Sequence, residues 1–161
     1  MKKQGFTLIE LMVVIVIMGI LAAVAVPKLF GMIAKSKASE VPTAAGTWVN
    51  LQDAYTVEAT SVGSWTQIGY NAPGTKDNAS SAHSNNFGYS DALTTNEATW
   101  TATAKNKLND CAIGGKWELK ASAENKSSAG TTYVKIVEGS SDANCKGLTP
   151  SFTNLVRTTF Q

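Results

Sequence analysis

The N-terminal part of the chain reads, from residue 5 to residue 27, GFTLIELMVVIVIMGILAAVAVP. The stretch from Phe6 to Val26 contains 21 residues, so as an α-helix it would be about 31 Å long and could cross the hydrocarbon core of a membrane. Its one ionisable side chain is that of Glu10. Because an ionised group inside such a segment costs about 2.5–3.5 kcal/mol near the bilayer centre, we expect Glu10 to have a partner.

Three ordinary explanations of this stretch compete. The first is a cleaved secretory signal peptide, with Lys2 and Lys3 as its basic region and residues 23–25 as its cleavage site, but the apolar stretch exceeds the usual ~7–15 residues. The second is a membrane anchor that is never processed, which leaves Glu10 unpaired in lipid. The third is a buried helix of a soluble core, in which every side of the helix would have to be covered. None of the three explains Glu10.

The first ten residues carry a resemblance to a known family. The leader KKQG at residues 2–5, followed by FTLIE at residues 6–10, resembles the class III signal peptide and cleavage junction of type IV prepilins and of the related pseudopilins of type II secretion. The resemblance continues along the apolar stretch, where Gly19 and Pro27 occupy the places of the family's helix-weakening glycine and helix-breaking proline. It covers about the first third of the chain.

The resemblance implies a processing reaction at the start of the chain. A prepilin peptidase would remove the leader, residues 1–5, by cutting after Gly5, and the same enzyme would methylate the new amine of Phe6. A glycine suits this position because a residue without a Cβ lets an extended backbone enter a narrow protease cleft. The positive-inside rule keeps Lys2 and Lys3 in the cytoplasm and places the residues after Pro27 outside the bacterial inner membrane.

Cleavage would also create the partner that Glu10 lacks. The amine of Phe6 is a cation, and in a stack of such helices it can face the Glu10 carboxylate of a neighbouring subunit. Much of this attraction would offset the desolvation of both charges, so the pair is expected to fix register more than to add stability. The same two groups are four residues apart and could also pair within one subunit.

Gly19 and Pro27 predict a weak part of the helix. Pro27 has no N–H, which leaves the carbonyl of Ala23 without its helical donor, and Gly19 costs about 1 kcal/mol of helix propensity relative to alanine. One interpretation is a simple kink of the kind that membrane helices tolerate. The other is that residues 19–27 partly unwind when subunits pack in a filament. Hydrogen exchange of this stretch in filaments would distinguish them.

Beyond Pro27 the apolar pattern becomes periodic. Within residues 28–60, apolar side chains recur at spacings of three, four and seven, which predicts an amphipathic helix to about Ala59 that buries one face. Residues 6–27 are therefore expected to be the membrane or filament-core half of one long helix, and residues 28–60 its amphipathic half. Pro42 interrupts the pattern, and the sequence does not decide whether it bends the helix.

The remainder of the chain predicts a small sheet. Residues 61–98 are rich in Ser, Asn, Gly and Thr and are expected to form a connecting loop region, with a short strand at 65–70 or 87–90. Residues 99–161 are expected to form an antiparallel sheet, with strand patterns at 98–105, 116–122 and 132–138 and a hairpin connection at 125–130. One long helix packed on about four antiparallel strands defines an α+β fold.

Cys111 and Cys145 are the only two cysteines and would lie outside the membrane. In an oxidising compartment they should pair, and closing a loop of about 35 residues contributes roughly 3–4 kcal/mol in the chain-entropy model. A disulfide-bounded C-terminal region is also similar to that of many type IV pilins. Two cysteines and the single His83 do not make a metal ligand set. Asp77, Asp91 and Asp142 lack the spacing of a calcium loop.

Charge and motifs give no support to other classes of function. The net charge of +2 comes from 14 basic and 12 acidic residues, and loss of Lys2 and Lys3 leaves 12 of each. We therefore expect no specific nucleic-acid partner. There is no nucleophile elbow, phosphate-binding loop or zinc-protease motif, so we expect no enzymatic activity, no catalytic residue and no cofactor.

The sequence thus predicts a structural pilin subunit that polymerises into a type IV pilus for adhesion, twitching motility or DNA uptake. The resemblance implies four partners: further copies in a helical filament, the inner membrane before assembly, the prepilin peptidase/N-methyltransferase, and the pilus assembly machinery. The expected location is the bacterial inner membrane for the precursor and the cell-surface pilus after assembly. An alternative is a pseudopilin of a type II secretion system, and a third is a tethered binding module that never polymerises.

Overall fold

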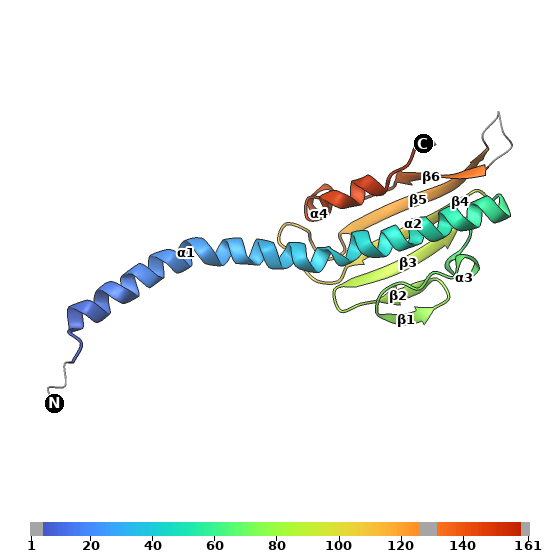
Figure 1. Ribbon diagram of the computed structural model, residues 1–161. Coiled ribbons are helices and arrows are strands. Elements are labelled where there is room, and N and C mark those ends of the chain that lie inside the picture. The colour runs from blue at the N-terminus through green and yellow to red at the C-terminus, as the bar shows by residue number, and fades with distance from the viewer. Residues whose placement is uncertain (1–4, 126–131, 159–161) are drawn as a thin grey trace. The chain divides into compact units, whose positions relative to one another are not determined.

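The computed structural model describes residues 5–125 and 132–158. The chain divides into two compact units, Met1–Ile33 and Ala34–Gln161. Along the chain (Figure 1) the helices and strands are α1 (Leu8–Ala38), α2 (Glu40–Ala59), α3 (Trp65–Ile68), β1 (Thr75–Asn78), β2 (Ser81–His83), β3 (Phe87–Leu93), β4 (Glu97–Ala104), β5 (Lys116–Asn125), β6 (Thr132–Glu138), α4 (Ala143–Lys146) and the 3₁₀-helix η1 (Pro150–Leu155).

The described part of the first unit consists of residues 5–7 and the N-terminal part of α1. This helix is continuous through Gly19 and Pro27, and by length and composition its apolar run is able to cross a membrane. Its large apolar side chains are exposed on every side, as in Ile9 at 68% and Leu21 at 64%. A helix that is apolar all round requires a membrane or neighbouring helices to cover it.

The predicted long helix is present from Leu8 to Ala59, and Pro42 explains why it is interrupted between α1 and α2. Because Pro42 has no N–H, it cannot donate a hydrogen bond to the carbonyl of Ala38. Helix α1 ends at Ala38. Ser39 nevertheless keeps a right-handed helical backbone, with φ −62° and ψ −17°, and its N–H donates to Lys35. The proline therefore interrupts the helix for one residue, and α2 ends at Ala59.

The second unit contains a six-stranded antiparallel sheet in the order β1-β2-β3-β4-β5-β6. The α+β class and the long helix packed on an antiparallel sheet are confirmed, but the prediction of about four strands was too low. The range 61–98 contains α3, β1, β2 and β3. The hairpin connection expected after Asn125 lies outside the described residues.

The short strand considered at residues 87–90 is confirmed as part of β3. The sequence missed α3, β1 and β2 for physical reasons. Strand β1 has the sequence TKDN and is exposed throughout, so it shows no alternation of apolar and polar side chains. Strand β2 has three residues. Residues 65–68, considered as a strand, form the short helix α3, in which Ser64 and Gln67 make a capping box.

The core lies between α2 and the sheet, and Figure 1 shows α2 along one face of the strands. Trp48 on α2, Trp100 on β4 and Trp117 on β5 are each fully buried. The polar atoms of Trp100 and Tyr70 are linked inside this core. The Trp100 Nε1–H donates to the Tyr70 hydroxyl at 3.1 Å, and this hydroxyl donates to the carbonyl of Ala44 at 3.1 Å. Burial raises the pKa of Tyr70 to about 12.

The chain reversal after α2 is held by a buried glutamine. The Gln52 side chain is fully buried, its Nε2 donates to the carbonyl of Gly63 at 2.6 Å, and its Oε1 accepts from the N–H of Gly63 at 3.1 Å. A Cβ at Gly63 would lie 2.9 Å from side-chain atoms of Tyr55 and Ile68. Glycine is therefore the residue that allows the backbone to approach the helix here.

Candidate assembly site

Glu10 lies in the first turn of α1 and contacts Thr7, the residue before the helix. The Glu10 Oε2 accepts hydrogen bonds from the backbone N–H of Thr7 at 2.8 Å and from its hydroxyl at 2.6 Å. In return, the N–H of Glu10 donates to the Thr7 Oγ1 at 3.3 Å. This reciprocal arrangement is a capping box, which satisfies backbone donors that the helix start leaves without partners.

The capping box corrects the interpretation that Glu10 has no partner before cleavage. Both bonds from Thr7 reach the same carboxylate oxygen, Oε2. The other oxygen, Oε1, makes no hydrogen bond within the part of the chain that the structure describes. Sequence reasoning missed the cap, although a threonine followed three residues later by a glutamate is its known signature.

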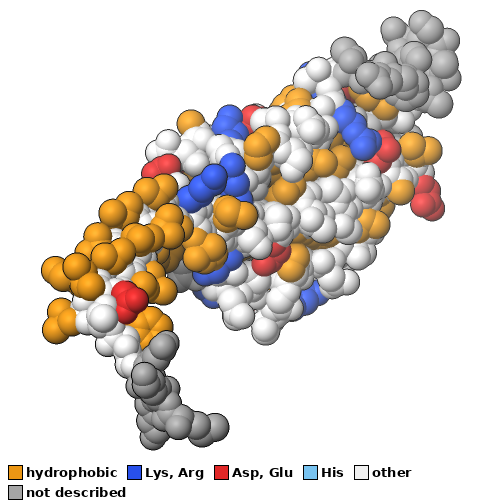
Figure 2. Space-filling view, turned by 60° about the vertical axis from the view of Figure 1, so that its left-hand side comes forward, with side chains coloured by type: hydrophobic (Ala, Val, Ile, Leu, Met, Phe, Trp, Pro, Cys, Tyr) orange, Lys and Arg blue, Asp and Glu red, His pale blue; other side chains and the backbone are white. Residues whose placement is uncertain are grey.

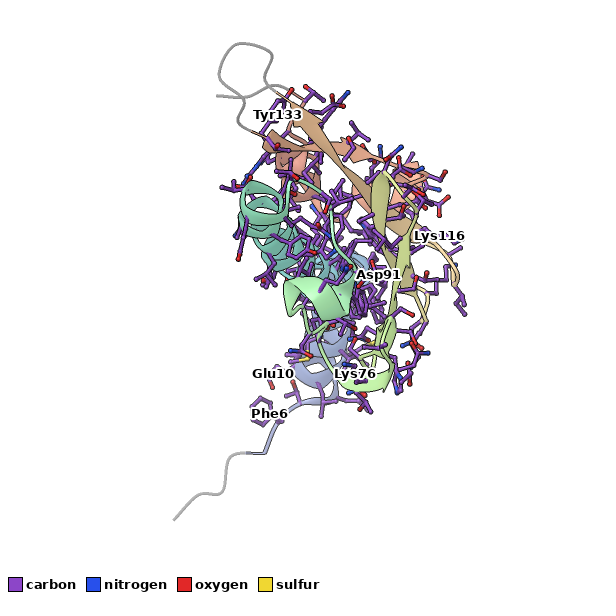
Figure 3. All side chains as sticks on the ribbon, turned by 90° about the vertical axis from the view of Figure 1, so that its right-hand side faces the viewer. Phe6, Glu10, Lys76, Asp91, Lys116 and Tyr133 are labelled. Atoms are coloured by element: carbon purple, nitrogen blue, oxygen red, sulfur yellow. A yellow bond between two sulfur atoms is a disulfide. The ribbon has the colours of Figure 1, made fainter. Side chains whose placement is uncertain are left out.

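Gly5 and Phe6 precede the helix in a non-helical, exposed segment. The Phe6 side chain is 87% exposed, and a Cβ at Gly5 would meet no atom within 4 Å. Figure 3 shows Phe6 and Glu10 close together at the same end of the chain. The bond between Gly5 and Phe6 therefore lies outside the helix, in a segment exposed to solvent. Lys2 and Lys3 of the leader lie outside the described residues.

The surface of the first unit is almost entirely apolar. Figure 2 shows hydrophobic side chains, in orange, covering the N-terminal helix. Between residues 6 and 33 the ionisable side chains are those of Glu10 and Lys28. Neighbouring helices packed on such a surface would find apolar contacts in many registers, and a charged group is one of the few features that can distinguish them.

Cys111 and Cys145 form the expected disulfide, and both residues are buried. The bridge joins the loop between β4 and β5 to α4. Gly115 lies directly against it, since a Cβ there would collide with both sulfur atoms. On the same side, the Asp142 carboxylate accepts from the backbone N–H of Lys116 at 2.7 Å. The covalent bond thus holds α4 to the loop between β4 and β5, and the hydrogen bond holds the residue before α4 to the start of β5.

Loss of the disulfide should lower the stability of the second unit. We expect the Cys111→Ala/Cys145→Ala variant to lose about 3–4 kcal/mol of unfolding free energy, because its unfolded chain is no longer constrained. Denaturant unfolding of the full chain in detergent measures this loss. The reduced wild-type protein is the matched control and should be destabilised similarly. A loss below about 1 kcal/mol in both would contradict the prediction.

Asp91 on β3 holds the short helix α3. Its Oδ2 accepts from the backbone N–H of Trp65 at 2.9 Å, whereas its buried Oδ1 has no hydrogen-bond partner among the described residues. Burial raises the pKa of Asp91 above its ordinary value, and the bond from Trp65 opposes this shift. The carboxylate is therefore costly to ionise in the folded state.

This burial predicts a pH-dependent contribution to stability. In the pH window between its unfolded pKa, near 3.9, and its higher folded pKa, Asp91 binds more protons in the folded state. Wild-type stability relative to Asp91→Asn should therefore fall as pH rises through this window, because the asparagine does not ionise. Chemical unfolding from pH 3 to pH 7 would measure the difference, with Asp110→Asn as an exposed control. A constant difference across that range would contradict the prediction.

The other residues considered as ligands do not come together. His83 Nδ1 and Asp77 Oδ1 are 2.7 Å apart, but both side chains are more than 40% exposed. Asp91 lies on β3, and Asp142 precedes α4. Among the described residues no group of three or more His, Cys, Asp or Glu side chains is placed to hold a metal ion.

Comparison with known proteins identifies the N-terminal segment. Residues 1–26 match the family described as the prokaryotic N-terminal methylation motif. The type IV major pilin protein PilA of Myxococcus xanthus (strain DK1622) is 47% identical over 57 residues, which are 35% of this chain and 23% of that protein. The type IV major fimbrial protein FimA of Dichelobacter nodosus is 52% identical over 44 residues, or 27% of this chain and 28% of FimA.

A third relative, the fimbrial protein EcpC of Eikenella corrodens, is 54% identical over 44 residues, which are 29% of its length. The chain thus spans about a quarter of the length of these curated relatives. No solved structure gives a significant match. The resemblance drawn from residues 2–10 is confirmed: the chain carries the prokaryotic N-terminal methylation motif, and its curated homologues are type IV pilins and fimbrial proteins.

Proposed function

We propose that this chain is a structural subunit that polymerises into a type IV pilus. The observation that carries the proposal is the methylation motif at residues 1–26, continued by a helix whose apolar side chains are exposed on every side. Such a helix needs a membrane before assembly and neighbouring helices after it. The names of the relatives, which are pilin and fimbrial proteins, support the same conclusion.

The proposed processing begins at the junction before α1. The peptidase cuts after Gly5, removes residues 1–5 and methylates the amine of Phe6, and the exposed, non-helical backbone at this point supports the reaction. The capping box of Thr7 and Glu10 persists after cleavage because the bond between Phe6 and Thr7 is retained. Glu10 Oε1 is then free to accept the Phe6 amine of a neighbouring subunit, and this pairing selects the register of assembly.

The long helix has two roles in this proposal. Residues 6–27 hold the precursor in the inner membrane, with the second unit outside, and later form the filament core. Residues 28–60 connect this core to the sheet. Gly19 and Pro27 are the positions at which the helix can give way as subunits pack, although both are helical in the single chain.

A pseudopilin of type II secretion is the alternative within the same class, and the disulfide between Cys111 and Cys145 favours the pilin. The proposed role is structural, and no catalytic residue is assigned. Electron microscopy of cells labelled with an antibody to residues 60–161 tests the proposal. We expect labelled fibres that extend from the cell surface. Label confined to the membrane, or an absence of external fibres, would overturn it.

A further inference from the structure

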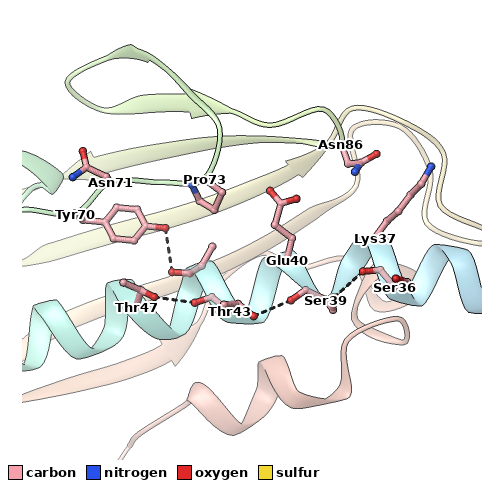
Figure 4. Close-up of a pocket in the computed structure, with 11 residues that line it drawn as sticks. Ser36, Lys37, Ser39, Glu40, Thr43, Thr47, Tyr70, Asn71, Pro73 and Asn86 are labelled. Carbon is pink, nitrogen blue, oxygen red and sulfur yellow. Dashed lines mark hydrogen bonds between the residues drawn. The ribbon is translucent and has the colours of Figure 1, made fainter.

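A polar groove in the second unit is not used by the proposed assembly. It has a volume of about 500 Å³ and lies between the helices and the loops of the sheet, within the ~300–1,000 Å³ range of small-molecule sites. One wall is formed by residues from Ser36 to Thr47, and the other includes Asn71, Pro73 and Asn86 (Figure 4).

The helical wall presents hydrogen-bond acceptors to the groove. The hydroxyls of Ser39, Thr43 and Thr47 each donate to a backbone carbonyl three or four residues earlier, at 2.7, 3.1 and 3.1 Å. The hydroxyl protons are thereby taken up in bonds within the helix, whereas each hydroxyl oxygen keeps lone pairs that can accept a hydrogen bond from a ligand. These three residues are spaced at successive turns, so their oxygens form a row along the groove.

Glu40 adds a fixed carboxylate to this row. Its Oε1 accepts from the buried Tyr89 hydroxyl at 2.6 Å, and its Oε2 has no hydrogen bond within the described part of the chain. Burial, followed by the bond to Glu40, raises the pKa of Tyr89 far above its ordinary value. The hydroxyl therefore stays protonated and keeps donating, which holds the carboxylate in one orientation.

Three side chains of the groove, those of Lys37, Asn71 and Asn86, have donor groups that are available to a ligand. Among the described residues, the Lys37 ammonium has no ion pair, and the side-chain amides of Asn71 and Asn86 make no hydrogen bond. One positive and one negative charge therefore line the groove together with two amides that both donate and accept. An anion would meet Glu40 and a cation would meet Lys37, so the groove disfavours a ligand with a single charge, and its row of oxygens and amides suits a ligand rich in hydroxyl groups.

We propose that this groove binds a neutral saccharide of about two rings. Each sugar hydroxyl supplies one donor and two acceptor lone pairs, so adjacent hydroxyls can donate to Glu40 Oε2 and the threonine oxygens while accepting from Lys37 and the two amides. Ala44 and Pro73 supply apolar contacts for the C–H face of a ring. The groove would give the subunit a binding activity beyond its structural role.

Saturation-transfer NMR tests this proposal on the full chain in a detergent without a sugar head group. The probes are lactose, maltose and N,N′-diacetylchitobiose. We expect at least one disaccharide to bind, and its affinity to fall tenfold or more in Glu40→Gln and in Lys37→Met. Glu40→Gln keeps an acceptor for Tyr89, so circular dichroism should show an unchanged fold.

Matched controls lie on the same helices outside the groove. Glu58→Gln and Lys35→Met change exposed residues of the same types and should leave the affinity within twofold of wild type. No binding of any disaccharide, or equal affinity in all four variants, would overturn the proposal. A loss of filament assembly in Lys37→Met without a change in sugar affinity would also overturn it, because the groove would then be a contact between copies.

Discussion

Replacing Glu10 by valine is expected to leave the protein in the membrane and to remove it from surface filaments. Valine continues the apolar surface of the helix, so insertion is retained or improved. The variant lacks the carboxylate that would accept the Phe6 amine of a neighbour, and helices with an apolar surface then pack without a defined register. Immunoblots of membrane and sheared-filament fractions measure the two pools, and we expect the filament pool to be lost.

A second substitution separates the charge of Glu10 from its capping role. Glu10→Gln retains an oxygen that can accept from the N–H and hydroxyl of Thr7, which now bond to Oε2. The amide is neutral and cannot pair with the amine as an ion. We expect Glu10→Gln to fail in assembly as Glu10→Val does. Normal filaments from the glutamine variant would show that the cap, and not the charge, is what assembly requires.

Replacing Trp48 by alanine is expected to cost about 3–5 kcal/mol of unfolding free energy. Trp48 is fully buried and lies on the face of α2 that packs on the sheet, so its removal leaves a cavity that the surrounding side chains fill only in part. Denaturant unfolding of the full chain in detergent, followed by circular dichroism, measures the loss.

Val57 supplies the control for this prediction, since it lies on the same helix and is 68% exposed. Val57→Ala should change the stability by no more than about 0.5 kcal/mol. Trp48→Phe should recover part of the stability lost in Trp48→Ala, because it fills more of the cavity. Equal stabilities of Trp48→Ala and Val57→Ala would contradict the position of Trp48 in the core.

The sequence predicted best the features that depend on long or strongly patterned stretches. The long helix ending at Ala59 follows from an apolar run and from helical periodicity. Trp48 lies within the periodic stretch at residues 28–60, and Trp100 and Trp117 lie within the strand patterns at 98–105 and 116–122; all three are buried. The pairing of Cys111 with Cys145 was expected because they are the only two cysteines and were predicted to lie in an oxidising compartment. In each case the decisive information lies in the residue types themselves and in their spacing.

The features that were missed depend on contacts between distant segments. The bond of Tyr89 to Glu40 joins residues 49 positions apart, and the clamp of Gln52 on Gly63 requires the chain to turn back on α2. Strand β1 is exposed and polar, so only its pairing with β2 makes it a strand. The groove of Lys37 and Glu40 likewise forms only when the loops of the sheet fold against the helix.

The mass of the subunit in sheared surface filaments tests the proposed assembly most directly. Intact mass spectrometry under non-reducing conditions should give a chain that begins at Phe6, carries one added methyl group and lacks two hydrogens through the disulfide of Cys111 and Cys145. Reduction should restore those two hydrogens. A filament subunit that still contains Met1–Gly5, or one that begins at a residue other than Phe6, would contradict the proposal that cleavage after Gly5 prepares the chain for assembly.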